Sequence, residues 1–358
     1  MREDSKREAM VNKTLRTVAP GTVLREGLEN ILRAKTGGLI VVGGSEAVLN
    51  ITDGGFSIQC DLTPSHMYEL AKMDGAIVVS DDLKKVLYAN ANLNPDHTLQ
   101  TSETGTRHRT AERVAKQTGQ LVICISQRRN VITLYQGTFK YSLKDIGVIL
   151  TKANQAIQTL EKYKAVLDQA LTNLSALEFE DLVSLQEVTL VLQRFEMVLR
   201  IKAEIRRYIT ELGSEGRLIS MQLDELVSRV DEEAYLLVKD YGLVGPDVSP
   251  HHILSFIHDL SSDDLLDGNS LAKILGYNTS NLLDEPVASR GYRLLNKITR
   301  LPQPVIENLV EHFQGLSNML EASVDDLDEV EGIGLVRARA VRDGLKRIQE
   351  QVFIDRHI

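Results

Sequence analysis

The chain has 358 residues, of which 43% are hydrophobic and 25% are charged, and its formal net charge is −9. This length and composition predict a folded protein of two or three domains and argue against a disordered chain. The negative charge excludes a general attraction to nucleic acid, so any contact with DNA would have to come from a local basic patch.

The sequence has no feature typical of export or of membrane insertion. Residues 1–7 are charged and do not resemble a secretory signal, and no apolar run approaches the roughly 20 residues that cross a bilayer. The two cysteines, Cys60 and Cys124, fit neither a metal-binding spacing nor a disulfide framework, and the apolar run around Cys124 places it in a core. We therefore expect a cytoplasmic protein with no membrane partner.

Residues 1–145 alternate short apolar runs, which are typical of strands, with helical patterns. The strand-like runs are residues 39–43, 76–80, 121–126 and 131–135, and the helical patterns cover residues 24–34 and 64–71. This alternation predicts an α/β domain with a central mixed sheet.

Asp74 and Gly75 stand directly before the second strand-like run. A carboxylate at the edge of a strand can hold a divalent cation such as Mg²⁺, which takes further ligands from substrate phosphates. Asp-Gly is also a common turn sequence, so this pair by itself leaves both interpretations open.

Residues 102–113 are the most informative stretch of the chain. They combine hydroxyl groups, a glycine and the cluster Arg107-His108-Arg109 at the start of a short predicted helix that ends at Gly119. Backbone N–H groups at a helix start, hydroxyls and guanidinium groups all favour an anionic ligand. Basic residues on a surface helix can also be merely solvated, but together with Asp74 they predict a polyphosphate site. No P-loop or dinucleotide fingerprint follows a predicted strand.

From about Ser142 to Gly242, within a segment that we assign to residues 146–289, the sequence has the pattern of long helices. Apolar residues recur at helical spacing across residues 185–212, and Gly213 and Gly216 end the run. A helix of about 30 residues would be roughly 45 Å long. The pattern predicts an all-α segment, either the core of a helical bundle or a spine that holds the two end domains apart.

Residues 290–358 contain a pattern suited to phosphate binding. A capping-box-like start at Ser323 is followed by Gly332-Ile333-Gly334 and by an arginine-rich helix. This arrangement resembles the helix-hairpin-helix motif, in which glycines let backbone N–H groups reach a phosphate. The implied DNA-binding residues, which would act without sequence preference, are Gly332, Ile333, Gly334, Arg337 and Arg339.

A degenerate copy of this motif precedes it. In residues 298–306 prolines take the places of the hairpin glycines, and the amphipathic residues Leu309, Val310 and Phe313 follow. Whether the Leu301–Pro304 hairpin contacts DNA is left open by the sequence.

Taken together, Asp74-Gly75-Ala76 and Arg107-His108-Arg109 resemble the paired signature of diadenylate cyclase domains. The order of a cyclase domain (1–145), a helical spine (146–289) and an all-α helix-hairpin-helix domain (290–358) is similar to that of the DNA integrity scanning family, over essentially the whole chain. The resemblance implies a nucleotidyltransferase that condenses two ATP molecules into cyclic di-AMP and releases two pyrophosphates.

The resemblance also implies partners and a cofactor. These are Mg²⁺ or Mn²⁺, branched or damaged DNA such as Holliday junctions, recombination and repair proteins, and a homo-octamer in which two tetrameric rings meet through their cyclase domains. Because each ATP must present its 3′-hydroxyl to the α-phosphate of the other, two protomers must face each other. The alternative is a DNA-junction binding protein whose N-terminal domain senses a nucleotide without chemistry.

Individual roles follow from the same resemblance. Asp74 would hold the metal ion and help to orient or deprotonate the 3′-hydroxyl, while Arg107 and Arg109 would offset charge on the transferring phosphoryl group. His108 stays open between a phosphate donor and a structural hydrogen-bonding residue, and Gly75 would let the backbone approach the nucleotide. The implied ATP-binding residues are Gly75, Ala76, Leu93, Thr106, Arg107, His108, Arg109, Thr110, Ser126 and Arg128.

Overall fold

The structure is a computed structural model that describes residues 2–243, 248–278, 281–282 and 285–356, with side chains from residue 9 onward. Contacts divide the chain into two compact units: unit 1 holds residues 1–154 and 206–220, and unit 2 holds residues 155–205 and 221–358. Residues 206–220 thus pack with the N-terminal unit, although their pattern is helical like that of their neighbours. The domain boundaries at residues 145 and 289 stay predictions.

Unit 1 contains an α/β domain, which confirms the predicted fold class. Its strands are β1 (Gly38–Val42), β2 (Thr52–Asp53), β3 (Phe56–Asp61), β4 (Ala76–Val79), β5 (Lys85–Leu93), β6 (Leu121–Ser126), β7 (Val131–Gln136) and β8 (Phe139–Ser142). Its helices are α1 (Arg2–Thr17), α2 (Val23–Arg33), α3 (Glu46–Leu49), α4 (Pro64–Leu70) and α5 (Thr106–Thr118).

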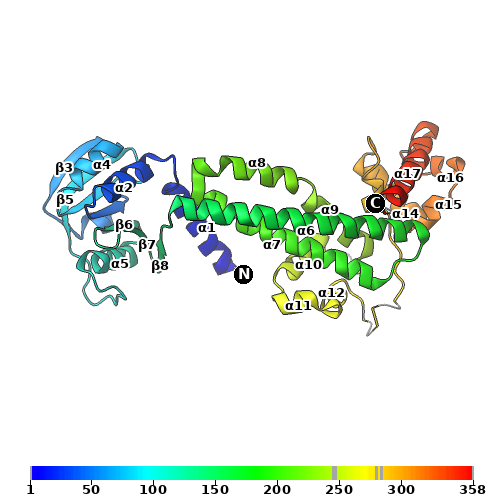
Figure 1. The fold of residues 1–358 in the computed structure, drawn as a ribbon, viewed down its shortest axis with the longest axis horizontal. Helices are drawn as coiled ribbons and strands as arrows, with labels where there is room; N and C mark the ends of the chain where they lie inside the picture. The colour runs from blue at the N-terminus through cyan, green and yellow to red at the C-terminus, as the bar shows by residue number, and fades with distance from the viewer. Residues whose placement is uncertain (1, 244–247, 279–280, 283–284, 357–358) are drawn as a thin grey trace. The chain divides into compact units, whose positions relative to one another are not determined.

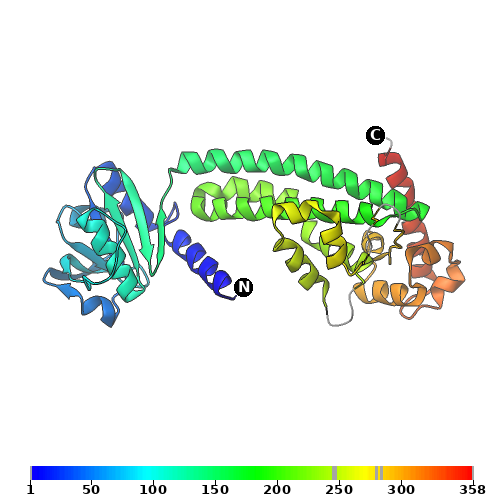
Figure 2. The same cartoon turned by 90° about the horizontal axis from the view of Figure 1, so that it is seen from below.

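The strands form one mixed sheet in the order β2-β5-β4-β1-β6-β7-β8, with β3 also paired to β5. Strands β1 and β4 are parallel, and the other pairs between the described strands are antiparallel. Figures 1 and 2 show helices on both faces of this sheet.

Alternate residues of the central strands supply two apolar cores, one on each face. In β1, Ile40 packs with the core that includes Leu28 of α2 and Met67 of α4, whereas Val41 packs with the core that includes Val114 of α5. Because both faces are covered, the central strands are uniformly apolar rather than alternating. This double burial explains why short apolar runs mark the central strands in the sequence.

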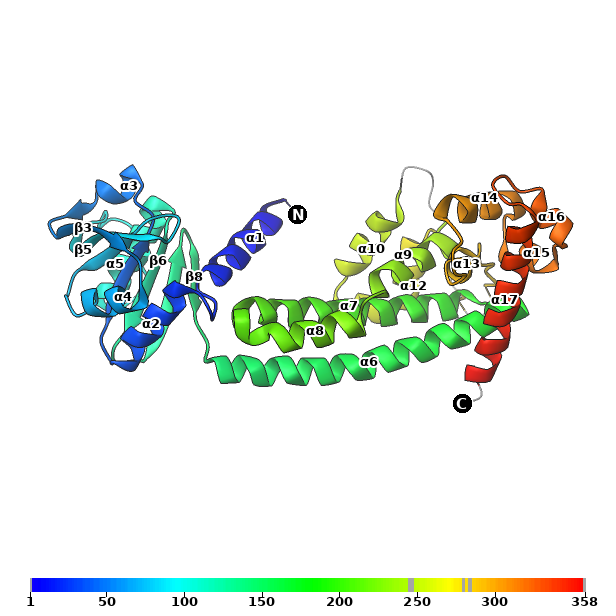
Figure 3. The same cartoon turned by 90° about the horizontal axis from the view of Figure 1, so that it is seen from above.

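The rest of the chain is helical, as predicted. The helices are α6 (Ile146–Glu180), α7 (Leu185–Leu212), η1 (Gly213–Gly216), α8 (Arg217–Leu226), α9 (Val230–Tyr241), α10 (Pro250–His258), α11 (Ser262–Leu266), α12 (Gly268–Ile274), α13 (Tyr292–Leu295), α14 (Gln303–Phe313), α15 (Leu316–Glu321), α16 (Val324–Asp328) and α17 (Leu335–Arg356). Within unit 2, α6 and α7 lie side by side (Figure 3). The predicted helix over residues 185–212 is confirmed, and Gly213 ends it at a φ of +51°. None of the described helices has the length and apolar character of a membrane span.

Candidate functional site

An open cleft of ≈ 580 Å³ in unit 1 collects most of the residues predicted to bind a nucleotide. The start of β4, the end of β5, the first turn of α5 and one residue of β1 build its walls. Its lining residues are Leu39, Asp74, Gly75, Ala76, Asn90, Ala91, Asn92, Leu93, Thr106, Arg107 and Thr110. The volume lies in the range of small-molecule sites, about 300–1,000 Å³.

Asn90 is a residue of the cleft whose role the sequence did not indicate. It adopts the left-handed conformation with a φ of +51°, at an irregularity in the pairing of β4 with β5. Its Oδ1 accepts a hydrogen bond from the backbone N–H of Gly75 at 3.0 Å. Asn90 therefore holds the start of β4, and with it the backbone that carries Asp74.

Gly75 is required by this close approach of two backbones. A Cβ atom at Gly75 would lie 2.3 Å from the carbonyl carbon of Asn90. Real Cβ atoms essentially never come so near, so a side chain there would push β4 and β5 apart. The packing of β4 against β5 therefore requires a glycine at position 75, in addition to the predicted close approach of a nucleotide.

Gly75→Ala is therefore expected to destabilise unit 1 by about 1–3 kcal/mol, as overpacking typically does, and to weaken ATP binding because Asp74 moves with the strand. Thermal unfolding and ATP titration would measure both effects. Gly105→Ala is the matched control for thermal unfolding, because a Cβ atom there meets nothing within 4 Å. Equal behaviour of the two variants would contradict the argument.

The first turn of α5 offers unpaired N–H groups to the cleft. The N-terminal cap is Gly105, which has no side chain to accept them, and the first intrahelical bond runs from the Arg109 N–H to the Gly105 carbonyl at 2.9 Å. The N–H groups before Arg109 therefore have no acceptor within the helix. Thr106, Arg107 and Thr110 share the face toward the cleft because they are three and four positions apart. This turn has the properties of an anion site.

Arg107 reaches across the cleft toward Asp74. Its Nη2 lies 3.9 Å from Oδ1 of Asp74, whose side chain is fully exposed to solvent. The guanidinium lies against the backbone of Gly37, where a Cβ atom would come within 1.9 Å of Nη1. The glycine at position 37 therefore leaves the space through which Arg107 enters the cleft. Because the ion pair is long and its Asp74 side is fully exposed, both groups are available to a ligand.

His108 faces the protein rather than the cleft. The Cys124 thiol lies 3.1 Å from its Nδ1, and its ring meets the Tyr135 ring edge to face with centroids 6.4 Å apart. Burial lowers the pKa of His108 and raises the pKa of Cys124 to about 12, so the thiol keeps its proton beside the imidazole. These contacts favour the structural interpretation of His108.

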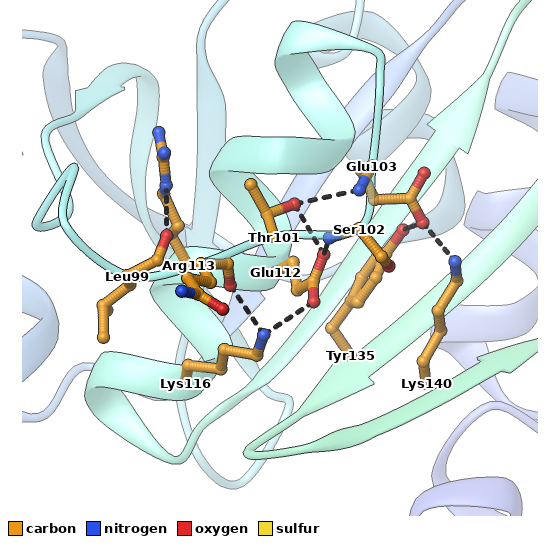
Figure 4. Close-up of polar contacts among 10 residues, drawn as sticks. Leu99, Thr101, Ser102, Glu103, Glu112, Arg113, Lys116, Tyr135 and Lys140 are labelled. Carbon is orange, nitrogen blue, oxygen red and sulfur yellow. Dashed lines mark hydrogen bonds and ion pairs between the residues drawn. The ribbon is translucent and has the colours of Figure 1, made fainter.

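The loop before α5 is anchored by two carboxylates (Figure 4). Glu112 accepts hydrogen bonds from the Thr101 hydroxyl at 2.7 Å and from the Lys116 ammonium at 2.8 Å. Burial acts to raise the pKa of Glu112, but these bonds outweigh it and hold the pKa below its usual value. Glu103 accepts from the Tyr135 hydroxyl at 2.7 Å and pairs with Lys140. These contacts of Glu103 and Glu112 hold the loop in place and thereby fix where α5 begins. The sequence did not indicate this role for the two carboxylates.

Besides His108, three predicted residues lie outside the cleft lining. Arg109 is exposed, about 200° around the helix axis from Arg107, so the two side chains cannot enter one cleft together. Ser126 accepts a hydrogen bond from the Arg129 N–H at 3.2 Å in the β6–β7 turn, and Arg128 is exposed in that turn. Their contact with a nucleotide stays a prediction.

The cleft could hold a metal ion that is coordinated partly by the protein and partly by a bound ligand. Among the described residues no group of three or more His, Cys, Asp or Glu side chains could surround a cation. A Mg²⁺ or Mn²⁺ ion at Asp74 would therefore take its remaining ligands from phosphates and water, as Mg²⁺ commonly does. Asp74 is exposed and suits this role.

The predicted DNA-binding residues lie around the turn between α16 and α17. The Ser323–Asp326 capping box at the start of α16 is confirmed, and Gly332 has a φ of +82°. The first bond of α17 runs from the Ala338 N–H to the Gly334 carbonyl at 3.0 Å, which leaves the preceding N–H groups without an intrahelical acceptor.

The side chains around this turn have different roles. Ile333 is buried in the apolar core, so only its backbone could meet a ligand. Arg337 donates a hydrogen bond from Nη1 to the Gly332 carbonyl at 2.6 Å, which steadies the turn. Arg339 is exposed and free to meet a phosphate.

Comparison with known proteins identifies the two large parts of the chain. A family model described as DisA bacterial checkpoint controller nucleotide-binding (DAC) matches residues 25–139, and a second, described as the DisA linker region, matches residues 143–283. The chain thus carries a nucleotide-binding domain of that family, and this domain contains the whole cleft lining.

Curated relatives match over nearly the full length. The DNA integrity scanning protein DisA of Carboxydothermus hydrogenoformans is 61% identical over 338 residues, which cover 94% of this chain and 96% of that protein. The protein of the same name from Bacillus subtilis is 58% identical over 357 residues, which cover 100% of this chain and 99% of that protein. These matches confirm the resemblance seen in the sequence motifs. This chain belongs to the DisA family of DNA integrity scanning proteins.

Proposed function

We propose that this chain is a diadenylate cyclase, which condenses two ATP molecules into cyclic di-AMP and releases two pyrophosphates. The observation that carries the proposal is the meeting of Asp74, Arg107 and the unpaired N–H groups of α5 in one open cleft. A carboxylate, a guanidinium and a helix start are groups that suit a nucleoside triphosphate with its metal ion.

The reaction balances with these groups. Two equivalent steps are needed. In each, the 3′-oxygen of one ATP attacks the α-phosphorus of the other, the bond from that phosphorus to the bridging oxygen of the β-phosphate breaks, and one pyrophosphate leaves. In this proposal Asp74 accepts the proton of the 3′-hydroxyl or orients that group, and Arg107 offsets charge on the phosphoryl oxygens, supported by the presence of both side chains in one cleft. When bound, the metal ion neutralises phosphate charge and polarises the phosphorus.

Ring closure requires a second protomer. A cleft of this size suits one nucleotide, and it is open, so the second ATP must be presented by another copy of the chain. We therefore propose a homo-oligomer in which clefts face each other in pairs, and from membership of the DisA family we propose that it is an octamer. The exposed Arg109, which cannot enter its own cleft beside Arg107, is suited to such an interface. Light scattering during size-exclusion chromatography would measure the mass of the assembly.

Incubation of the full chain with ATP and either MgCl₂ or MnCl₂, followed by chromatography and mass spectrometry, tests the reaction. We expect cyclic di-AMP and pyrophosphate in a ratio of one to two. ATP binding without any cyclic product under both metals would instead support a DNA-junction protein with a non-catalytic nucleotide-sensing domain.

We propose further that the C-terminal helices bind branched or damaged DNA as a helix-hairpin-helix domain, so that synthesis of cyclic di-AMP reports DNA integrity. Support comes from the Gly332–Gly334 turn and from the N–H groups that α17 leaves without an intrahelical acceptor. The binding would be to phosphates, hence dependent on salt and indifferent to sequence. Recombination and repair proteins are proposed partners through the same DNA.

Gly334→Glu is expected to weaken binding to a four-way junction by about tenfold or more, because it sets a carboxylate against the phosphate. A Cβ atom at Gly334 meets nothing within 4 Å, so the variant should fold. Gly315→Glu is the control of equal charge, since its nearest contact would be at 3.9 Å. Fluorescence anisotropy measures binding, and cyclase rates with and without junction DNA measure coupling. Unchanged binding by Gly334→Glu would contradict the assignment of the turn.

A further inference from the structure

The C-terminal part of unit 2 contains two turns of the same conformation. The upstream turn (residues 298–302) precedes α14, and the downstream turn (residues 330–334) precedes α17. The middle residue of each is left-handed, with a φ of +66° at Arg300 and +82° at Gly332. In each turn the fourth residue donates its N–H to the first carbonyl: Leu301 to Ile298 at 3.4 Å, and Ile333 to Val330 at 3.0 Å.

The helices that follow begin in the same way. The Ile306 N–H donates to the Pro302 carbonyl at 3.2 Å, and the Ala338 N–H donates to the Gly334 carbonyl at 3.0 Å. In α14 the Val305 N–H also donates to the Pro302 carbonyl, at 3.0 Å. Position 300 therefore corresponds to position 332, and position 302 to position 334. The degenerate copy seen in the sequence is a true structural repeat.

The two turns pack reciprocally. Val305, in the first turn of α14, lies 3.6 Å from the point where a Cβ atom of Gly332 would be, and the Asn308 side chain donates to the Glu331 carbonyl at 2.9 Å. The Ile298 side chain, from the upstream turn, lies 3.0 Å from the point where a Cβ atom of Gly344, in α17, would be. A DNA backbone that reaches the downstream turn would therefore pass close to the helix start that follows the upstream turn.

The two turns differ in what they can offer a phosphate. The downstream turn leads into N–H groups of Leu335 and Val336 that have no acceptor within the helix. The upstream turn has Pro302 and Pro304 at its helix start, and proline has no N–H. Pro304 takes the place of Val336, so the Gln303 N–H is the one backbone donor left at the first two positions of α14. The guanidinium of Arg300 adds side-chain donors to this turn.

Arg300 is exposed, and it has no ion pair or side-chain hydrogen bond to any residue that the structure describes. Glycine adopts the left-handed conformation more readily than arginine does, so the turn itself does not call for an arginine. We propose that the upstream turn is a second DNA-phosphate contact of this domain, made by the guanidinium of Arg300 instead of by backbone N–H groups. This inference rests on the proposed DNA binding.

The test is Arg300→Gly in the full chain, measured by fluorescence anisotropy with a four-way junction over a series of salt concentrations. Glycine suits the φ of +66°, so the variant should fold with a melting temperature close to that of the unmodified protein. Loss of one phosphate contact should lower the slope of log K against log salt by about 0.9. Arg300→Lys should retain most of that slope because it keeps the charge.

Lys35→Gly is the matched control. Lys35 is also exposed, cationic and left-handed, with a φ of +55°, but it lies in unit 1. The substitution removes the same charge and relieves the same conformation, and DNA binding should stay unchanged.

The outcomes separate the two proposals. Weaker, less salt-dependent binding by Arg300→Gly, with Lys35→Gly unaffected, supports the second contact. If Arg300→Gly binds like the unmodified protein while Gly334→Glu loses binding, the second contact is refuted and the downstream turn stands. If the unmodified protein does not bind the four-way junction at any salt concentration, the proposed DNA-binding function itself is refuted.

Discussion

Asp74→Asn is expected to lower cyclic di-AMP synthesis by about 10²- to 10⁴-fold or more, the range over which a positioned acid or base contributes. Asparagine has the size of aspartate, but it carries no charge to hold a cation and cannot take up the proton of the 3′-hydroxyl. The Asp74 side chain is fully exposed, so the fold should not depend on it. Product formation would be followed by mass spectrometry, and folding by thermal unfolding.

Asp61→Asn supplies the control for this loss. Asp61 is an exposed carboxylate at the end of β3 and does not line the cleft, so its substitution should leave synthesis unchanged. ATP binding by Asp74→Asn should persist in part, because Arg107 and the start of α5 remain. Synthesis at the rate of the unmodified protein would show that Asp74 has neither proposed role.

The second large effect is expected in the core of unit 2, where Arg293→Met should cost about 3–5 kcal/mol of stability. The Arg293 side chain is 1% exposed and pairs with Glu178, which is 0% exposed. Arg293 also donates to the Ser175 hydroxyl at 3.0 Å, and Glu178 accepts from the Tyr241 hydroxyl at 2.7 Å. Removal of the guanidinium would leave the Glu178 carboxylate buried without a cation.

The loss should depend on pH because a second acid, Asp240, lies in the same core. Burial, together with Glu178, raises the pKa of Asp240 to about 7, while Arg293 acts to lower it. A carboxyl whose pKa rises on folding stabilises the fold at low pH, and this stabilisation is lost as the pH climbs from about 4 to 7. Without Arg293 the pKa of Asp240 loses the influence that lowers it and rises further. The destabilisation by Arg293→Met should therefore be larger at pH 8 than at pH 5.

Two further variants make this prediction specific. Glu178→Gln combined with Arg293→Met removes both charges and should recover most of the stability, since Nε and Nη1 of Arg293 have no acceptor among the described residues even in the intact pair. Arg356→Met breaks the half-exposed pair with Glu180 and should change stability by about 0–1 kcal/mol. Chemical denaturation at both pH values measures all three. A small effect of Arg293→Met at pH 8 would contradict the argument.

Much of the fold could be predicted because local patterns and burial agree. The helix at residues 185–212 and its glycine end follow from apolar spacing, and the central strands follow from apolar runs buried on both faces. Arg107 and Thr110 could be placed near one another because a helix brings residues three positions apart onto one face. Asn90 could not be found, since its role depends on pairing between strands β4 and β5 that no local pattern encodes.

By itself the sequence determined the family, the α/β and helical classes of the two ends, and the chemical groups of the nucleotide site, because motifs and periodicity are properties of neighbouring residues. Only the tertiary structure decided which of those groups share a cleft. It turned Arg107 toward Asp74 and Arg109 away, directed His108 to Cys124, and showed Arg300 in the conformation of Gly332. The physical reason is that the direction of a side chain depends on helix rotation and on packing between segments that lie far apart in the chain.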